Sequence, residues 1–436
     1  MKWVLLTIAL VLIAFVFDLG LLVYAACAVV GATLFARWVT KRWAAGLTAS
    51  RVCSDEEVEV GHLVTIKGMI SNEGRMDVGW VLIEDVLPAD TQLFKPHKLE
   101  VEGERVGVFH LASGESRPFD YRIRCNRRGY YQIGPLLMET GDPFGFFRRF
   151  KVASEPSFLL VLPKPVSIEG YDIAARRPIG EIHIQHRLFE DPTRISGVRR
   201  YELGDPMNRV HWKATARTGV LHSKTYEPSA LAGATIVLDF HTRSHVAKHE
   251  PYRSEIGISV ATSLAHAVFL MGQQVGLVTN ARDAVDRIRE EGWRGQERSR
   301  TAAQQSVAMA DRSERLRPVV VPTNNDADRF HRIQQTLARA ELTDGLTLAE
   351  LMLEAEPRLP RDATVVVISP NFDELAATTL SGLVERGFFV TAVVNTYEQE
   401  DFARMAGPLV AVGVRCLHLR EETSIPRVCR AQWYGR

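Results

Sequence analysis

The chain has 436 residues, which on the usual domain size is about two to three domains. Its 53 lysines and arginines balance 52 acidic residues, and the formal net charge of +1 lacks the imbalance typical of nucleic-acid binders and acidic tails. Hydrophobic residues make up 46% and charged residues 24%, which excludes a disordered or collagen-like chain. The cysteines show no CxxC spacing, so neither a zinc site nor a disulfide framework is indicated.

The stretch from Trp3 to Ala36 is apolar and carries one charge, at Asp18. One helix of that length would measure roughly 51 Å at about 1.5 Å per residue, against a hydrocarbon core of about 30 Å. The break at residues 18–20 therefore predicts a transmembrane helical hairpin over residues 1–42. Basic residues at both ends predict a multi-pass protein of the inner (cytoplasmic) membrane with the bulk of the chain cytoplasmic. A single tilted span and a cleaved signal peptide are the alternatives.

Residues 50–165 have the pattern of a β-sandwich. Apolar and polar residues alternate at period two over residues 63–70, and further strand candidates recur about every ten to fifteen residues without a helical period. This pattern favours an antiparallel sandwich of immunoglobulin-like type. Sandwiches of this kind usually present binding surfaces.

Two arginine pairs stand out in the sandwich sequence, one before and one after a Gly-Asp-Pro-Phe-Gly turn. One interpretation is a structural corner with solvated arginines. The other is a basic corner that meets anionic lipid or a partner protein. The residues of this predicted basic corner are Arg127, Arg128, Asp142, Arg148 and Arg149.

Residues 166–230 form a segment in which polar, aromatic and turn residues are densely interleaved. A short helix starting near residue 209 would place Arg209 and Lys213 on one face. Guanidinium groups pair bidentately with carboxylates and phosphates, so the segment could bind an anion or a partner peptide. A buried ion-pair knot between domains, or a catalytic site at Asp205 and His211, are the alternatives. The candidate residues are Arg199, Arg200, Tyr201, Gly204, Asp205, Arg209, His211, Trp212, Lys213 and Arg217.

Residues 127–149 and 197–217 together resemble the paired motif of the bacterial and archaeal domain of unknown function 58 family. The motif reads RRG-Y-x-hGP…DPFG-hh, followed by G-h-R-x-Y-x-x-GD-x-x-R-x-I-x-W-K-x-[ST]-A-R, with Val210 in the usual isoleucine place. The resemblance implies an amino-terminal membrane hairpin and a von Willebrand factor A-like domain. It also implies a MoxR-type AAA+ ATPase as a partner.

Residues 231–436 alternate apolar strands with helices, which predicts a doubly wound α/β domain. The apolar run 234–238 ends at Asp239, where a von Willebrand A-like domain would start an Asp-x-Ser-x-Ser metal loop. Here His241 and Arg243 stand in the serine places, and a guanidinium repels magnesium. Asp239 is therefore a weak metal candidate. Residues 282–317 carry nine arginines and seven acids without an apolar stripe, which predicts an exposed insertion; a docking segment for an acidic partner is the alternative.

These patterns predict a membrane-anchored, non-enzymatic scaffold or adaptor that binds a MoxR-type AAA+ ATPase and other envelope proteins. Membrane lipid is an expected contact, nucleic acid is not, and no cofactor is expected beyond possible magnesium. The sequence shows no phosphate loop, nucleophile elbow or complete metal motif. A metal-dependent envelope enzyme centred on Asp239, or on Asp205 and His211, is the alternative.

Overall fold

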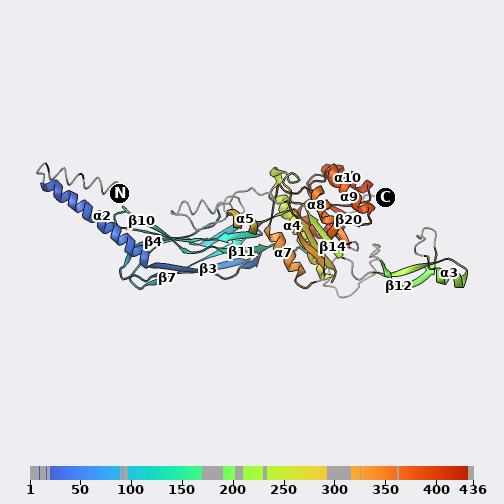
Figure 1. The fold of residues 1–436 in the computed structure, drawn as a ribbon, viewed down its shortest axis with the longest axis horizontal. Coiled ribbons are helices and arrows are strands. Elements are labelled where there is room, and N and C mark those ends of the chain that lie inside the picture. Colours follow the sequence, from blue (N-terminus) through green and yellow to red (C-terminus); the bar gives the residue numbers. More distant parts are fainter. Residues whose placement is uncertain are drawn as a thin grey trace. The chain divides into compact units, whose positions relative to one another are not determined.

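The computed structural model in Figure 1 describes residues 20–88, 97–168, 190–201, 210–228, 233–291, 316–324, 326–360 and 363–430, with residues 9, 16 and 91 singly. The chain divides into two compact units. The first comprises Met1–Leu162 and Ala284–Asp311, and the second comprises Pro163–Asp283 and Arg312–Arg436. Each unit has its own hydrophobic core and is described by itself.

The first long element is helix α2 (Gly20–Gly46). The prediction of a transmembrane hairpin is wrong, since within the described chain no helix has both the length and the hydropathy needed to cross a bilayer. The predicted fold class and the multi-pass inner-membrane localisation are corrected with it. Instead of ending at Ala36, α2 continues for ten residues and buries Val39 and Trp43 in the core of the sandwich. Some of its apolar residues therefore serve tertiary packing. The predicted first arm lies outside the described residues except for Ala9 and Val16.

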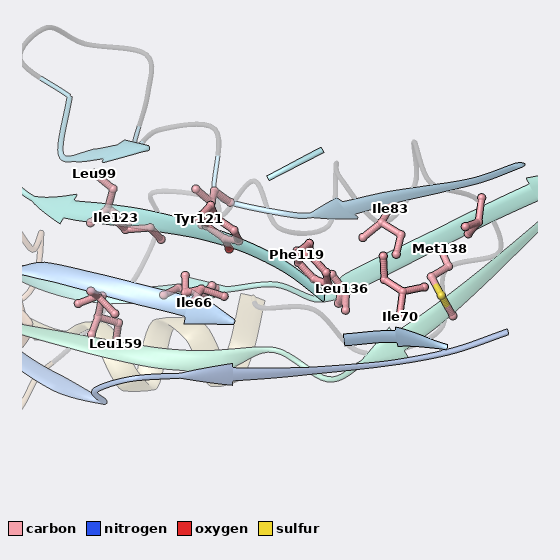
Figure 2. Packing of buried hydrophobic residues seen from close by; sticks show 14 of the residues in the cluster. Ile66, Ile70, Ile83, Leu99, Phe119, Tyr121, Ile123, Leu136, Met138 and Leu159 are labelled. Carbon is pink, nitrogen blue, oxygen red and sulfur yellow. The ribbon is translucent and has the colours of Figure 1, made fainter. Parts of the chain in front are cut away.

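The first unit packs three sheets around one core. Strands β3 and β7 bury alternate residues, which confirms the period-two pattern. Figure 2 shows Ile66, Phe119, Leu136 and Ile83 distributed along the hydrophobic core of this unit. The first sheet has the strand order β1 (Leu47–Cys53), β3 (Leu63–Asn72), β7 (Ser116–Cys125), β5 (Leu99–Gly103). The second has the order β10 (Arg148–Ser154), β9 (Leu136–Gly141), β4 (Val78–Asp85), β6 (Val106–Leu111). The third has the order β2 (Glu57–Glu59), β11 (Ser157–Leu162), β8 (Gly129–Ile133). The prediction of a wholly antiparallel sandwich is wrong in one place, because β2 and β11 pair in parallel.

The second unit is built on a six-stranded sheet in the order β17-β15-β14-β19-β20-β21. Its strands are β14 (Gly233–Leu238), β15 (Gln274–Thr279), β17 (Val319–Asn324), β19 (Ala363–Ser369), β20 (Val390–Val394) and β21 (Arg415–His418). All neighbours pair in parallel except β17, which is antiparallel to β15. The apolar run of β14 is confirmed as a buried central strand.

Helices cover both faces of this sheet (Figure 1). Ile236 and Leu238 of β14 pack in one hydrophobic cluster while Val237 between them packs in another, so successive residues face opposite layers. The first layer contains α4 (Tyr252–Leu270) and α7 (Arg329–Arg339), and the second contains α8 (Leu348–Ala355), α9 (Glu374–Glu385) and α10 (Gln399–Ala411). The chain moves outward from β14 in one direction and from β19 in the other. The crevice between their carboxyl ends is therefore the topological switch point, where open α/β sheets bind ligands.

Two further segments complete the described chain. Strands β12 (Glu190–Arg200) and β13 (His222–Pro228) pair antiparallel around helix α3 (Trp212–Thr218), and we call this element the signature hairpin. The predicted insertion begins with β16 (Arg282–Asp283), which pairs with β18 (Ala340–Glu341), and α5 (Ala284–Glu291). Ala284 and Ile288 are buried, so this start is a packed element, in contrast to the predicted exposed loop. The remainder, residues 292–315, lies outside the described part.

Candidate functional site

The signature hairpin fixes the described signature residues through strand pairing. Arg199 lies opposite Ser223 and Arg200 opposite His222. Because successive side chains of a strand point to opposite faces, the two arginines do not converge on one site. Tyr201 extends the ladder by donating its backbone N–H to the carbonyl of Leu221 at 2.9 Å. Gly204, Asp205 and Arg209 lie outside the described residues, so the predicted Asp205–His211 pair stays a prediction.

Helix α3 confirms that a short helix forms here, but its first residue is Trp212 and not a residue near 209 as predicted. The backbone N–H of Ala214 donates to Nδ1 of His211 at 3.0 Å, so this imidazole caps the amino end of the helix. The carboxyl end is closed by Gly219, which has a φ of 69° and donates to the carbonyl of Thr215. The geometry therefore gives His211 a structural role in which the nitrogen facing the helix is already occupied.

Helix α3 presents signature side chains at the surface. None of its residues is buried, and Trp212 is 64% exposed. Lys213 and Arg217 are also exposed and lie one turn apart on the same side of the helix. In the described part of the hairpin, the residues of α3 therefore do not form the predicted buried cluster of aromatic residues and ion pairs.

The switch point of the α/β sheet is filled by a hydrogen-bonded network around Asp239, which is 1% exposed. Its Oδ1 accepts from the side-chain amide of Asn280 at 2.9 Å and from the backbone N–H of His241 at 3.0 Å. Its Oδ2 accepts from the hydroxyl of Ser369 at 2.8 Å. These donors come from the ends of β15 and β19 and from the loop after β14. The carboxylate is thus turned inward and ties three strand ends together.

The residues around Asp239 do not fit a magnesium site. Magnesium prefers octahedral oxygen ligands, but Ser369 and Asn280 present hydrogen-bond donors to Asp239. Nδ1 of His241 accepts from the backbone N–H of Arg243 at 3.1 Å, which stabilises the loop after β14. In the described chain, no group of three or more His, Cys, Asp or Glu residues could hold a metal ion.

Charged residues that the sequence analysis did not single out lie in the loop after β14. Nδ1 of His245 is 2.7 Å from Oε1 of Glu250, and its Nε2 is 3.0 Å from the carbonyl of Asp239. Burial alone would lower the pKa of His245, but these two hydrogen bonds raise it overall. Burial alone would raise the pKa of Glu250, but hydrogen bonds from His245 and Ser254 lower it overall. The position of this loop at the strand's carboxyl end was the signal that could have identified the pair.

The predicted basic corner is not formed. Arg127 and Arg128 precede β8, whereas Arg148 and Arg149 begin β10 opposite the end of β9. The whole of β8 and β9 lies between them, up to roughly 40 Å of extended chain at about 3.3 Å per residue.

Asp142 is buried and holds the turn itself. Its carboxylate accepts from the backbone N–H groups of Phe144 at 2.9 Å, Phe146 at 3.4 Å and Phe147 at 2.6 Å. The rings of Phe144 and Phe146 are exposed and stacked with their centroids 6.0 Å apart, so neither fills the core. The two arginine pairs thus belong to opposite ends of a ribbon, and Asp142 has a structural role at one of them.

The fold and the hairpin define a protein with a β-sandwich unit and a doubly wound α/β unit, the latter carrying an exposed basic hairpin. Residues 197–306 match the family model described as Protein of unknown function DUF58. Uncharacterized protein YeaD of Bacillus subtilis (strain 168) is 21% identical over 232 residues, which is 53% of this chain and 55% of that protein. The resemblance to the DUF58 family is thus confirmed over residues 197–306, and the chain spans about half the length of this curated relative.

Solved structures show weaker likenesses. The CARDB domain of a Pyrococcus furiosus protein is 12% identical, with a TM-score of 0.19, over 27% of this chain and 94% of that one. Proximal thread matrix protein 1 from the mussel byssus is 11% identical, with a TM-score of 0.30, over 46% of each chain. Scores this low carry no argument about fold or function. The predicted von Willebrand factor A-like assignment of the α/β unit is therefore not shown.

Proposed function

We propose that the protein is a non-enzymatic adaptor or scaffold that binds partner proteins during assembly or maturation of an envelope complex. The observation that carries this proposal is the exposed helix α3, which carries Trp212, Lys213 and Arg217 at its surface and is capped at both ends. Tryptophan and arginine are the residues that contribute most to protein–protein binding when they are presented in a fixed geometry. By the family resemblance, one partner is a MoxR-type AAA+ ATPase.

The hydrogen bonds at the switch point of the α/β sheet favour the adaptor function over the alternative of a metal-dependent enzyme. Asp239 is the acid best placed for catalysis on such a sheet, yet three internal donors already occupy its carboxylate. A carboxylate in this state would have to lose those hydrogen bonds before it could bind a metal or abstract a proton. The metal-dependent alternative makes a separate prediction: magnesium, manganese or calcium would raise the melting temperature of the wild-type chain and not that of Asp239→Ala.

The test is direct binding between the purified full chain and the MoxR-type ATPase encoded in the same genome, with ATP hydrolysis as a second readout. We expect wild type to bind and to change the hydrolysis rate, and Trp212→Ala to lose both effects. Leu375→Ala is the control, because Leu375 is an exposed apolar residue of α9 in the same unit. Binding of Trp212→Ala equal to wild type contradicts the role of α3. Catalytic turnover of a small molecule that Asp239→Ala abolishes would overturn the adaptor function.

A further inference from the structure

Positive charge is concentrated in residues 197–224 of the signature hairpin, whereas the whole hairpin, residues 190–228, has seven basic and five acidic residues. Residues 197–224 contain six lysines and arginines and two acidic residues, a net charge of +4 against +1 for the whole chain. In the described stretches 197–201 and 210–224 every charged side chain is basic, at Arg199, Arg200, Lys213, Arg217 and Lys224. A basic surface of this kind attracts a surface of opposite charge and suppresses binding of like-charged partners.

Apolar side chains are exposed among these charges. Besides Trp212, the residues Val198, Val220 and Leu221 of the hairpin are exposed to solvent. Single exposed apolar residues are ordinary, but a group of four with a tryptophan on one short element indicates an interaction surface. Val220 and Leu221 follow Gly219, the residue that caps α3, so these two apolar residues lie at the same end of the hairpin as Lys213 and Arg217.

The hairpin holds this surface in a fixed geometry. The backbone N–H of His211 donates to the carbonyl of His222 at 2.8 Å, and the N–H of His222 donates to Oγ1 of Thr215 at 3.1 Å. These bonds fasten both ends of the turn that carries Trp212 to strand β13. A side chain presented by an ordered element loses less conformational entropy on binding, which favours affinity.

The chemistry of the surface selects its occupant. A second copy that paired residues 197–224 with the same residues of the first copy would bring together two segments of net charge +4, which repel each other. A nucleic acid would satisfy the cations and could stack on Trp212, but the aliphatic side chains of Val198, Val220 and Leu221 would have no apolar counterpart on a phosphate backbone. A protein segment with carboxylates around an apolar residue matches both features, because interface cores combine apolar anchors with a charged rim.

We infer that the signature hairpin docks an acidic segment of a partner protein, with Trp212 in an apolar pocket and carboxylates facing Lys213 and Arg217. This inference rests on the proposed adaptor function and adds the chemistry of the partner to it.

The experiment starts with a photo-crosslinker in the full-length chain in cells, as Val220→p-benzoylphenylalanine, and identifies the crosslinked peptide by mass spectrometry. A synthetic peptide of that sequence and its analogue with Gln for Glu and Asn for Asp are then titrated against the purified chain by fluorescence anisotropy. The variants are Trp212→Ala and Lys213→Gln/Arg217→Gln. Matched controls elsewhere in the second unit are Leu375→Ala and Lys248→Gln/Arg358→Gln, which change residues that are also exposed.

The inference predicts a net acidic crosslinked peptide whose uncharged analogue binds at least about tenfold more weakly. Trp212→Ala should weaken binding about 30-fold or more, as truncation of a hot-spot tryptophan does, without changing the salt dependence. Lys213→Gln/Arg217→Gln should weaken binding about fivefold and flatten the loss of affinity between about 0.1 and 1 M NaCl, where the Debye length falls from roughly 10 to 3 Å. Both controls should bind as wild type does.

Three outcomes overturn the inference. The first is a crosslinked peptide that is neutral or basic, or an analogue that binds as well as the acidic peptide. The second is tighter binding of a single-stranded oligonucleotide of equal charge than of the acidic peptide. The third is no crosslink at position 220 in a chain that still binds its ATPase partner. Each of these outcomes contradicts only the inference about the acidic segment and is compatible with the proposed adaptor function. If the wild-type chain binds no partner protein at all, both proposals are overturned.

Discussion

The core of the sandwich contains a buried ion pair whose removal should be costly. Nη1 of Arg51 donates to Oδ1 of Asp85 at 2.5 Å, and the hydroxyl of Tyr121 donates to Oδ2 at 2.7 Å. The side chains of Arg51 and Asp85 are only 2% and 0% exposed. Arg51 lies on β1 and Asp85 ends β4, so the pair joins the two four-stranded sheets. Burial, the largest influence, raises the pKa of Asp85, and the Arg51 charge and the Tyr121 hydroxyl oppose it.

The perturbation is Asp85→Asn, which keeps the shape of the side chain and removes its charge. Arg51 would then be a buried guanidinium without a carboxylate, and breaking a buried pair in this way costs about 3–5 kcal/mol of the free energy of unfolding. Tyr121→Phe removes one hydrogen bond to a charged group and should cost about 1.5–3 kcal/mol. The double variant Arg51→Met/Asp85→Leu should cost less than Asp85→Asn, because both desolvation penalties disappear together.

The assay is amide hydrogen exchange of β3 and β7 in the full chain, which reports the opening free energy of the sandwich separately from that of the α/β unit. A global melting curve would mix the two units. Asp120→Asn is the control, since Asp120 is exposed on β7 and the same chemical change there should stay within about 0.5 kcal/mol of wild type. The reasoning is refuted if Asp85→Asn costs less than about 1 kcal/mol, or if the double variant is as unstable as the summed single variants.

Three further predictions concern stability. The raised pKa of His245 and the lowered pKa of Glu250 make their pair fully stabilising between the ordinary values of 4.5 and 6.5. The contribution disappears as the pH rises through the raised pKa of His245, or falls through the lowered pKa of Glu250; a pH profile of α4 exchange unchanged by His245→Gln would contradict this. Thr347→Ala removes the capping box that Thr347 forms with Glu350, and exchange of α8 amides should report a loss of about 1 kcal/mol, whereas wild-type protection would contradict the cap. Asp142→Ala removes the acceptor of three backbone N–H groups, so amides 144–147 should exchange faster by about 1–3 kcal/mol of opening free energy; unchanged rates would show that the turn does not depend on Asp142.

Local patterns predicted several elements correctly because their cause is local. The alternation in β3 and β7 follows from a strand with one buried face, and the apolar run of β14 follows from burial on both faces. The predicted alternation of strands and helices over residues 231–436 is confirmed by α4, which follows β14 and buries most of its residues. The short helix α3 was also predicted, but its start was placed three residues too early, near residue 209 instead of Trp212.

The candidate sites depended on contacts between residues distant in sequence, which periodicity does not encode. Arg127 and Arg148 look like neighbours across a turn, yet the register of β8–β11 places the two arginine pairs at opposite ends of a ribbon. From the sequence, Asp239 is an acid that could bind a ligand. In the structure its carboxylate accepts hydrogen bonds from Asn280 and Ser369, which lie 41 and 130 residues away in sequence.

The sequence by itself determined that this chain has a sandwich-like β-rich part, an α/β part with an acid after its central strand, and a basic signature segment. Only the tertiary structure decided what those residues do. It turned Asp239 inward, exposed Trp212 on the signature hairpin, and packed the end of the apolar helix α2 against the sandwich. The physical reason is that hydropathy and charge measure what a side chain prefers, whereas strand register and packing decide which partner satisfies that preference.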